Sequence, residues 1–144
     1  MGRRAKNINL LVVFLTILAR ITVPGWSLVT LGIIFLLPIT IFHFVAINRT
    51  IDTYRNNYIY SFGQIYVSIF MYPFFMLLQS EGDDMSSFIV VDGLISRFNS
   101  DYNMRTVNIW SNIKVFCSII SGITMIICDL TLFLKVNKYR KGIQ

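Results

Sequence analysis

The sequence contains few of the residues that build enzyme and metal centres. Two cysteines, one histidine and seven acidic residues occur among its 144 residues. Cys117 and Cys128 lie eleven residues apart in one apolar stretch, so on a single helix about 16 Å separates them, well beyond the reach of a disulfide. No Cys-x-x-Cys pair, glycine-rich phosphate loop or metal-ligand spacing is present. We therefore expect no enzymatic activity, no cofactor, no metal site and no disulfide between these cysteines.

Apolar residues, in contrast, are abundant and occur in long runs. Hydrophobic residue types make up 55% of the chain. A helix needs about 20 residues to cross a hydrocarbon core of about 30 Å. Four stretches near that length are predicted as transmembrane helices, at residues 8–23, 28–47, 58–79 and 113–134. The expected fold is an all-α membrane protein, with residues 1–144 forming a single four-helix transmembrane domain.

Lysine and arginine are distributed unevenly between the two sides of these stretches. The flanking segments on one side carry nine basic residues against the single acid Asp52, whereas the other side carries five acids against Arg97 and Arg105. Cytoplasmic segments near membrane spans accumulate basic residues. Both termini are therefore predicted to be cytoplasmic, and residues 80–112 to form a long outer loop. The predicted cytoplasmic basic face includes Arg49, Arg55, Lys135, Lys138, Arg140 and Lys141.

The first stretch also shares features with a secretory signal peptide. Arg3, Arg4 and Lys6 precede an apolar run, as in the basic and apolar regions of such a peptide. Arg20 and the lack of a small-x-small cleavage site favour a retained transmembrane helix instead.

The net charge of +6 raises the question of nucleic-acid binding. The basic residues are spread over the termini and one short loop, however, with no recognition module around them. We expect no direct nucleic-acid binding. The expected partners are membrane lipid, including anionic headgroups near the basic tail, and a cytosolic protein at the basic face.

Three polar side chains lie at matched depth inside the predicted spans. His43, Gln64 and Asp129 each lie six or seven residues from the polar segment at the cytoplasmic end of their stretch, which is about 9–10 Å along a helix. Polar residues at such depth normally face other protein or water. We predict that the three form one intramembrane polar layer. Interhelical hydrogen bonds that fix packing register are the favoured interpretation, and a proton or ion path or a pH-sensitive switch is the alternative.

The fourth stretch carries residues suited to close helix packing. Ser118, Gly122, Met125 and Asp129 are spaced by four, three and four residues, which places them on one face. Small residues on such a face let another helix approach closely. A second face of the same stretch holds Cys117, Ser121, Thr124 and Cys128. Two packing faces on one helix predict a homo-oligomer.

Arg20 lies near the outer end of the first stretch. Its long side chain could extend to the lipid headgroups. Alternatively, it could pair with acids that follow the third stretch and so tie the first helix to the outer loop. These acids are Glu81, Asp83 and Asp84. We predict extension to the headgroups with partial pairing.

The predicted outer loop is too long for a simple turn and is partly apolar. Residues 88–91 are typical of a short strand, whereas Leu94, Ile95 and Phe98 recur at the spacing of an interfacial helix. Loops of this length without a function are uncommon. The loop is therefore either a lid over the helix ends or a surface that senses or binds something outside the membrane.

Four short spans, both termini inside, a long outer loop and a basic tail together resemble the membrane subunit of the Kiwa anti-phage defence system. The same plan is also similar to immunity proteins against pore-forming colicins. The resemblance covers the whole chain at the level of topology and composition and transfers no individual residue. An excess of 22 isoleucines over three alanines is typical of an AT-rich gene and indicates a horizontally acquired bacterial locus. The predicted location is therefore the bacterial inner membrane. The Kiwa resemblance implies an oligomeric component that detects infection and works with a cytosolic DNA-binding partner.

The predicted function is that of a non-enzymatic, homo-oligomeric inner-membrane sensor or scaffold in anti-phage defence. It would couple the outer loop to a cytosolic partner. An ion or proton channel and a bacteriocin immunity protein are the two alternatives.

Overall fold

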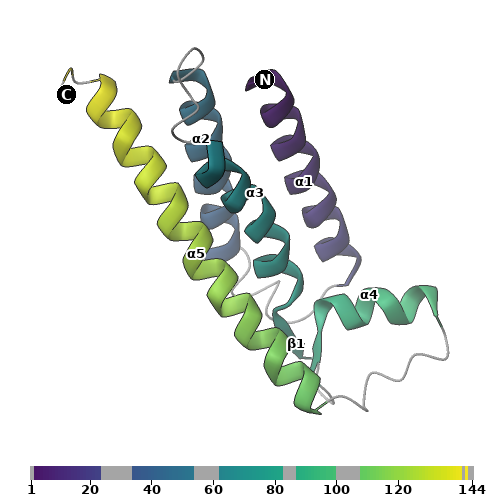
Figure 1. The fold of residues 1–144 in the computed structure, drawn as a ribbon. Coiled ribbons are helices and arrows are strands. Elements are labelled where there is room, and N and C mark those ends of the chain that lie inside the picture. The colour runs from purple at the N-terminus through teal and green to yellow at the C-terminus, as the bar shows by residue number, and fades with distance from the viewer. Residues whose placement is uncertain are drawn as a thin grey trace.

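The computed structural model describes residues 2–23, 34–53, 62–82, 87–99, 108–140 and 142. Within these ranges the chain is mainly helical, with one short hairpin (Figure 1). The elements in chain order are α1 (Gly2–Thr22), α2 (Leu37–Thr53), α3 (Phe62–Leu77), β1 (Ser80–Gly82), β2 (Ser87–Ile89), α4 (Val90–Phe98) and α5 (Asn108–Arg140).

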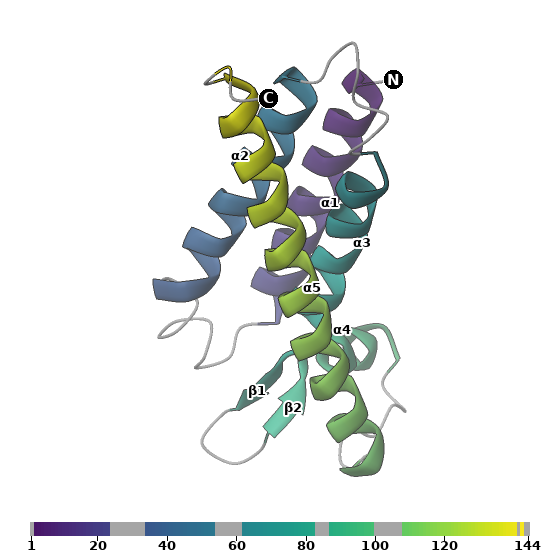
Figure 2. The ribbon, with the colours of Figure 1, turned by 60° about the vertical axis from the view of Figure 1, so that its left-hand side comes forward.

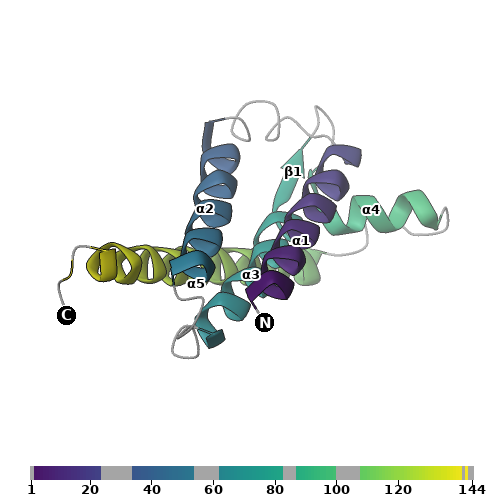
Figure 3. The same ribbon diagram turned by 90° about the horizontal axis from the view of Figure 1, so that it is seen from above.

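The four longer helices pack together as an antiparallel bundle. α5 contacts α2 and α3, and α1 contacts the same two helices. The start of α1, the end of α2, the start of α3 and the end of α5 lie at one end of the bundle, whereas α4 and the hairpin lie at the other end (Figures 1 and 2). Seen from above, α5 is strongly tilted relative to the other helices (Figure 3). Each end of the bundle therefore collects segments that are distant in sequence.

Three helical segments are long and apolar enough to cross a membrane, namely Arg3–Thr22, Ile34–Thr53 and Asn112–Arg140, and Gly63–Leu77 is a shorter apolar helix. Their outward faces are apolar: Phe14 and Phe70 are each 60% exposed. Polar side chains such as Asn9 and Asp129 are instead fully buried. An apolar exterior around a polar interior reverses the usual pattern of a soluble protein. This distribution is consistent with a helical membrane protein.

Three helices extend beyond the spans predicted from apolar runs. α1 begins at Gly2, whereas the predicted span began at residue 8. α2 continues to Thr53, where the prediction ended at residue 47, and α5 covers Asn108–Arg140 rather than residues 113–134. The extra turn of α2 is held in place because Ile51 is buried and the Thr50 hydroxyl donates to the Ala46 carbonyl at 2.7 Å. The predicted span starts at residues 28–33 and 58–61 lie outside the described residues.

The core consists of two apolar layers separated by a polar one. The layer near the termini is formed by Ala5, Ile47, Ile51, Ile65, Ile69 and Leu132, and the layer near α4 by Val13, Tyr72, Met76 and Met125. The residues that fall between these layers on the same helix faces are polar: Asn9 follows Ala5 by four positions and precedes Val13 by four. This spacing of one helical turn aligns the three layers on each helix.

The described part of the predicted outer loop contains both a strand and a helix. β1 and β2 pair in antiparallel register, with Ser80 opposite Ile89 and Gly82 opposite Ser87. Thus the strand predicted at residues 88–91 ends at Ile89, and α4 follows at once with Val90. The Val90 N–H donates to the Gln79 carbonyl at 3.1 Å, so α4 starts directly beside the end of α3.

Candidate functional site

Four polar side chains, one from each helix of the bundle, meet between the two apolar layers. They are Asn9 of α1, His43 of α2, Ser68 of α3 and Asp129 of α5, and each has a relative exposure of 0%. We call these four residues the central polar cluster. His43 Nδ1 lies 2.9 Å from Asp129 Oδ2, and His43 Nε2 lies 3.2 Å from Asn9 Oδ1. The Ser68 hydroxyl donates to Asp129 Oδ1 at 2.5 Å, so hydrogen bonds connect all four helices.

An aromatic ring fixes the orientation of the His43 imidazole. The Tyr72 ring stacks on it with a centroid distance of 4.8 Å and an interplanar angle of 9°. The Tyr72 hydroxyl is in turn 3.0 Å from the Thr40 hydroxyl, which lies on the helix of His43. Tyr72 is itself fully buried. The imidazole therefore has little freedom to turn away from Asp129.

Both ring nitrogens of His43 lie within hydrogen-bond distance of a polar side chain. Nδ1 faces the Asp129 carboxyl group, and Nε2 faces the Asn9 amide oxygen. In the observed orientation Asn9 Nδ2 has no hydrogen-bond partner among the described residues.

The arrangement differs from a Ser-His-Asp catalytic triad. In a triad, serine and aspartate bind opposite nitrogens of the histidine. Here Ser68 and Asp129 both lie on the Nδ1 side, with Ser68 Oγ 3.3 Å from Nδ1, and Nε2 faces Asn9. Full burial also leaves no surface to which a substrate could bind. The geometry instead suits a junction that fixes how the four helices pack.

Gln64, which was predicted to share a layer with His43 and Asp129, lies elsewhere. Its Oε1 accepts a hydrogen bond from Lys135 Nζ at 2.7 Å. Because α3 and α5 are antiparallel, Gln64 faces a position six residues beyond Asp129, closer to the end of the bundle that holds the termini. Ser68, one turn further along α3, occupies the position predicted for Gln64.

Arg20 points into the protein rather than toward its surface. It is 1% exposed, and its Nη2 lies 3.5 Å from Gln79 Oε1, at the end of α3. The predicted extension to headgroups is therefore not observed. Of the predicted acidic partners, Asp83 and Asp84 lie outside the described residues, and Glu81 is described only as part of β1.

A different ion pair connects the outer elements. Lys114 near the start of α5 pairs with Asp92 of α4, and the carboxylate side chain is only 7% exposed. The sequence-based prediction did not connect these residues. Asp92 had been counted among the outer acids and Lys114 lay at the edge of a predicted span, so their positions alone gave no pairing signal.

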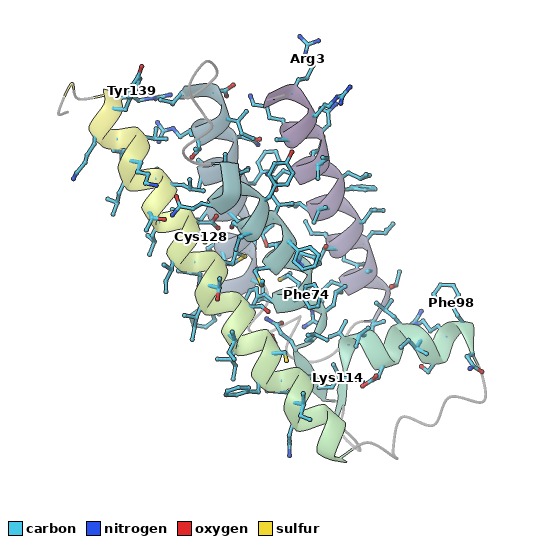
Figure 4. All side chains as sticks on the ribbon, viewed as in Figure 1. Arg3, Phe74, Phe98, Lys114, Cys128 and Tyr139 are labelled. Atoms are coloured by element: carbon cyan, nitrogen blue, oxygen red, sulfur yellow. The ribbon has the colours of Figure 1, made fainter. Side chains whose placement is uncertain are left out.

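The predicted basic face lies at the end of the bundle that holds the termini. Lys138 and Arg140 are exposed in the last turns of α5, and Arg3 lies at the same end (Figure 4). The Arg49 guanidinium is 5.8 Å from the centre of the Phe133 ring. Lys6 pairs with Asp52 there. Arg55 and Lys141 lie outside the described residues.

The predicted packing stripe of α5 is used inside the chain. The Ser118 hydroxyl donates to the Phe75 carbonyl at 2.9 Å, and Met125 is fully buried. A Cβ on Gly122 would lie 2.6 Å from Phe75 Cδ2, so only glycine allows this approach of α5 to α3. The stripe therefore packs α5 against α3 of the same chain, and an oligomer would need another face.

Sequence reasoning identified part of this cluster and missed its surroundings. The predicted polar layer did not include Asn9 or Ser68. Thr40 and Tyr72 were not recognised. The sequence signal that could have identified them is helical spacing. Thr40 precedes His43 by three residues and Tyr72 follows Ser68 by four, which places each pair on one helix face.

Comparison of the chain with protein-family models, with curated proteins and with solved structures found no match.

Proposed function

We propose that this chain is a non-enzymatic bacterial inner-membrane subunit that couples an outer segment to a basic cytoplasmic face. In this proposal α1, α2, α3 and α5 are four membrane spans, and both termini are cytoplasmic. The apolar exterior, the three sufficiently long helices and the basic end of the bundle support this orientation.

The observation that carries the proposal is the continuity of α5. Its 33 residues correspond to about 50 Å, well beyond a hydrocarbon core of about 30 Å. Near its start Lys114 pairs with Asp92 of α4, about two thirds of the way along it Asp129 contributes to the central polar cluster, and near its end Lys135 binds Gln64. One unbroken helix thus connects the outer elements, the bundle centre and the basic end. A displacement of α4 would be transmitted along it.

A fluorescence experiment tests this coupling. An environment-sensitive dye is attached at Lys138→Cys, in a chain that also carries Cys117→Ser and Cys128→Ser. Asp92→Asn, which breaks the outer ion pair, is expected to shift the dye emission at the opposite end of α5. Arg97→Gln is the control, because Arg97 is exposed on the same outer helix. Unchanged emission with Asp92→Asn would refute coupling through α5.

Affinity purification in mild detergent tests for the cytosolic partner. A protein that binds the basic end should be lost with Arg140→Glu, because this side chain is exposed in the last turn of α5. The same protein should be retained with Arg97→Glu, which makes the equivalent charge change on α4. Loss with both variants, or with neither, would contradict binding at the basic end.

The resemblance to the Kiwa membrane subunit supports a role in anti-phage defence within this proposal. It would make the chain a homo-oligomeric sensor whose partner is cytosolic. A defence assay distinguishes this role from colicin immunity: cells that carry the intact system should resist phage, whereas protection against one pore-forming toxin alone would favour the immunity alternative.

A proton-conducting oligomer is the second candidate function. The observation that favours it is the hydrogen-bonded pair of His43 and Asp129, two ionisable side chains that lie between the two apolar layers of the bundle. A single buried polar layer does not form a continuous path across the bundle. We therefore favour coupling through α5 over proton conduction.

A further inference from the structure

The outer helix α4 has an exposed apolar face. Val91, Leu94, Ile95 and Phe98 recur at intervals of three, one and three residues, which places them on one face of the helix. Phe98 is 91% exposed and Ile95 is 40% exposed. Ser96 lies on the opposite face. An exposed phenylalanine and isoleucine on so short a helix indicate a surface with an apolar partner.

The orientation of this face is fixed by the rest of the protein. The Val90 N–H donates to the Gln79 carbonyl at 3.1 Å, which ties the start of α4 to the end of α3. One turn in, Asp92 pairs with Lys114 of α5. Val90 is fully buried and Asp92 is 5% exposed. α4 therefore cannot roll about its axis without breaking these contacts.

The fixed orientation directs the apolar face toward the level of the bundle. α4 lies across the long axis of the bundle, at the end opposite the termini (Figures 1 and 3). The Phe98 ring stands on the side of α4 that faces that level (Figure 4). α1 contacts α4, and its last turns expose Leu18 at 48% and Ile21 at 60%. The apolar exterior of α1 thus continues onto α4.

We infer that α4 lies in the lipid–water interface of the outer leaflet, with Phe98 and Ile95 against acyl chains. Short helices with an apolar and a polar face lie in the plane of such interfaces. The inference rests on the proposed function and deepens it, because the outer segment would then respond to the lipid interface itself. A soluble ligand would need a face directed away from the bundle, whereas this face is directed toward the level at which the spans end.

Single-tryptophan fluorescence in phosphatidylcholine vesicles tests the inference. The two native tryptophans, Trp26 and Trp110, are replaced by phenylalanine. Tryptophan is then introduced either as Phe98→Trp, on the apolar face, or as Ser96→Trp, on the opposite face. Both proteins are checked for unchanged helix content by circular dichroism, and Arg97→Trp replaces the control if Ser96→Trp does not fold. Quenching is measured with aqueous iodide and with brominated phosphatidylcholine.

The expected result is that Phe98→Trp emits at shorter wavelength than the control. It should be quenched more by brominated lipid and less by iodide. Equal quenching by iodide at both positions would place the face in water and overturn the inference. Protection of Phe98→Trp from both quenchers would mean that protein, such as a second copy of this chain, covers the face, and would overturn it as well. These outcomes concern α4 alone, whereas the dye experiment on α5 tests coupling separately.

Discussion

Replacing Asp129 tests the central polar cluster most directly. The carboxylate accepts hydrogen bonds from His43 and Ser68 and is fully buried. Asp129→Ala removes both acceptor oxygens, so the hydrogen bonds of His43 and Ser68 to this residue are lost. Asp129→Asn keeps an oxygen for the Ser68 hydroxyl and offers an amide N–H to His43 Nδ1, which can accept when the ring proton is on Nε2 and donates to Asn9. The two variants should therefore differ strongly.

The expected difference in the free energy of unfolding follows from the number of buried hydrogen bonds that each variant loses. A buried donor without an acceptor costs about 1–3 kcal/mol in soluble proteins, whereas interhelical hydrogen bonds in a membrane protein contribute about 0.6 kcal/mol on average and about 1.7 at most. Two lost bonds in a fully buried cluster lie at the upper end of the membrane range. We expect Asp129→Ala to lower the free energy of unfolding by about 2–3 kcal/mol and Asp129→Asn by less than about 1 kcal/mol.

The free energy of unfolding can be measured by titrating sodium dodecyl sulfate into mixed micelles and following helix content. Asp52→Asn is the matched control, since it makes the same chemical change in an ion pair with Lys6 whose carboxylate is 61% exposed. Such an exposed pair contributes about 0–1 kcal/mol. A double-mutant cycle between Asp129→Ala and His43→Ala isolates the interaction energy between the two side chains. It does so because the stability change of the double variant is compared with the sum of the changes of the two single variants.

Two results would refute the reasoning. Equal destabilisation by Asp129→Asn and Asp129→Ala would show that the cluster needs the negative charge and not the hydrogen-bond acceptor. A coupling energy of zero between Asp129 and His43 would show that the 2.9 Å contact does not stabilise the fold.

Three further predictions use other features of the bundle. Gly122→Ala should lower the free energy of unfolding by about 1–3 kcal/mol through overpacking against Phe75, whereas Gly63→Ala, whose Cβ would meet no atom within 4 Å, should cause no loss; equal effects in the same titration would argue against close packing at Gly122. Liposomes that contain the native chain should show no proton flux beyond that of Asp129→Asn, and a flux present only in the native chain would favour the channel. Blue-native gels in mild detergent should show a species larger than the monomer, and monomer alone would contradict the oligomer.

The helical, membrane-like character of the chain could be predicted because it depends on composition. Apolar runs near the length of a membrane span and the separation of basic from acidic segments need no knowledge of tertiary contacts. Helix ends were harder to place. α2 continues past residue 47 because Ile51 is buried in the same core cluster as Ala5 of α1 and Thr50 bonds within its own helix, and neither feature is visible in a hydropathy pattern.

Only part of the central polar cluster could be predicted from sequence, because some of its members are selected by tertiary packing. Counting residues from the polar ends put His43 and Asp129 at one depth, and the structure places them in hydrogen-bond contact. The same counting put Gln64 there too, because Gln64 and Ser68 share a face of α3 and only the packing of α3 against α5 selects between them. The Asp92–Lys114 pair depends on how α4 docks at the end of the bundle, which no spacing rule predicts.

The central polar cluster also has a consequence for how the protein is made. His43 and Asp129 are separated by 86 positions, and Asp129 lies on α5, which follows α1, α2 and α3 in the chain. Until α5 packs against the other helices, Asn9, His43 and Ser68 form an incomplete polar surface on α1, α2 and α3, without the Asp129 carboxylate. A chain truncated before α5 would therefore keep these polar side chains but lose the Asp129 carboxylate that joins His43 to Ser68 in the folded protein.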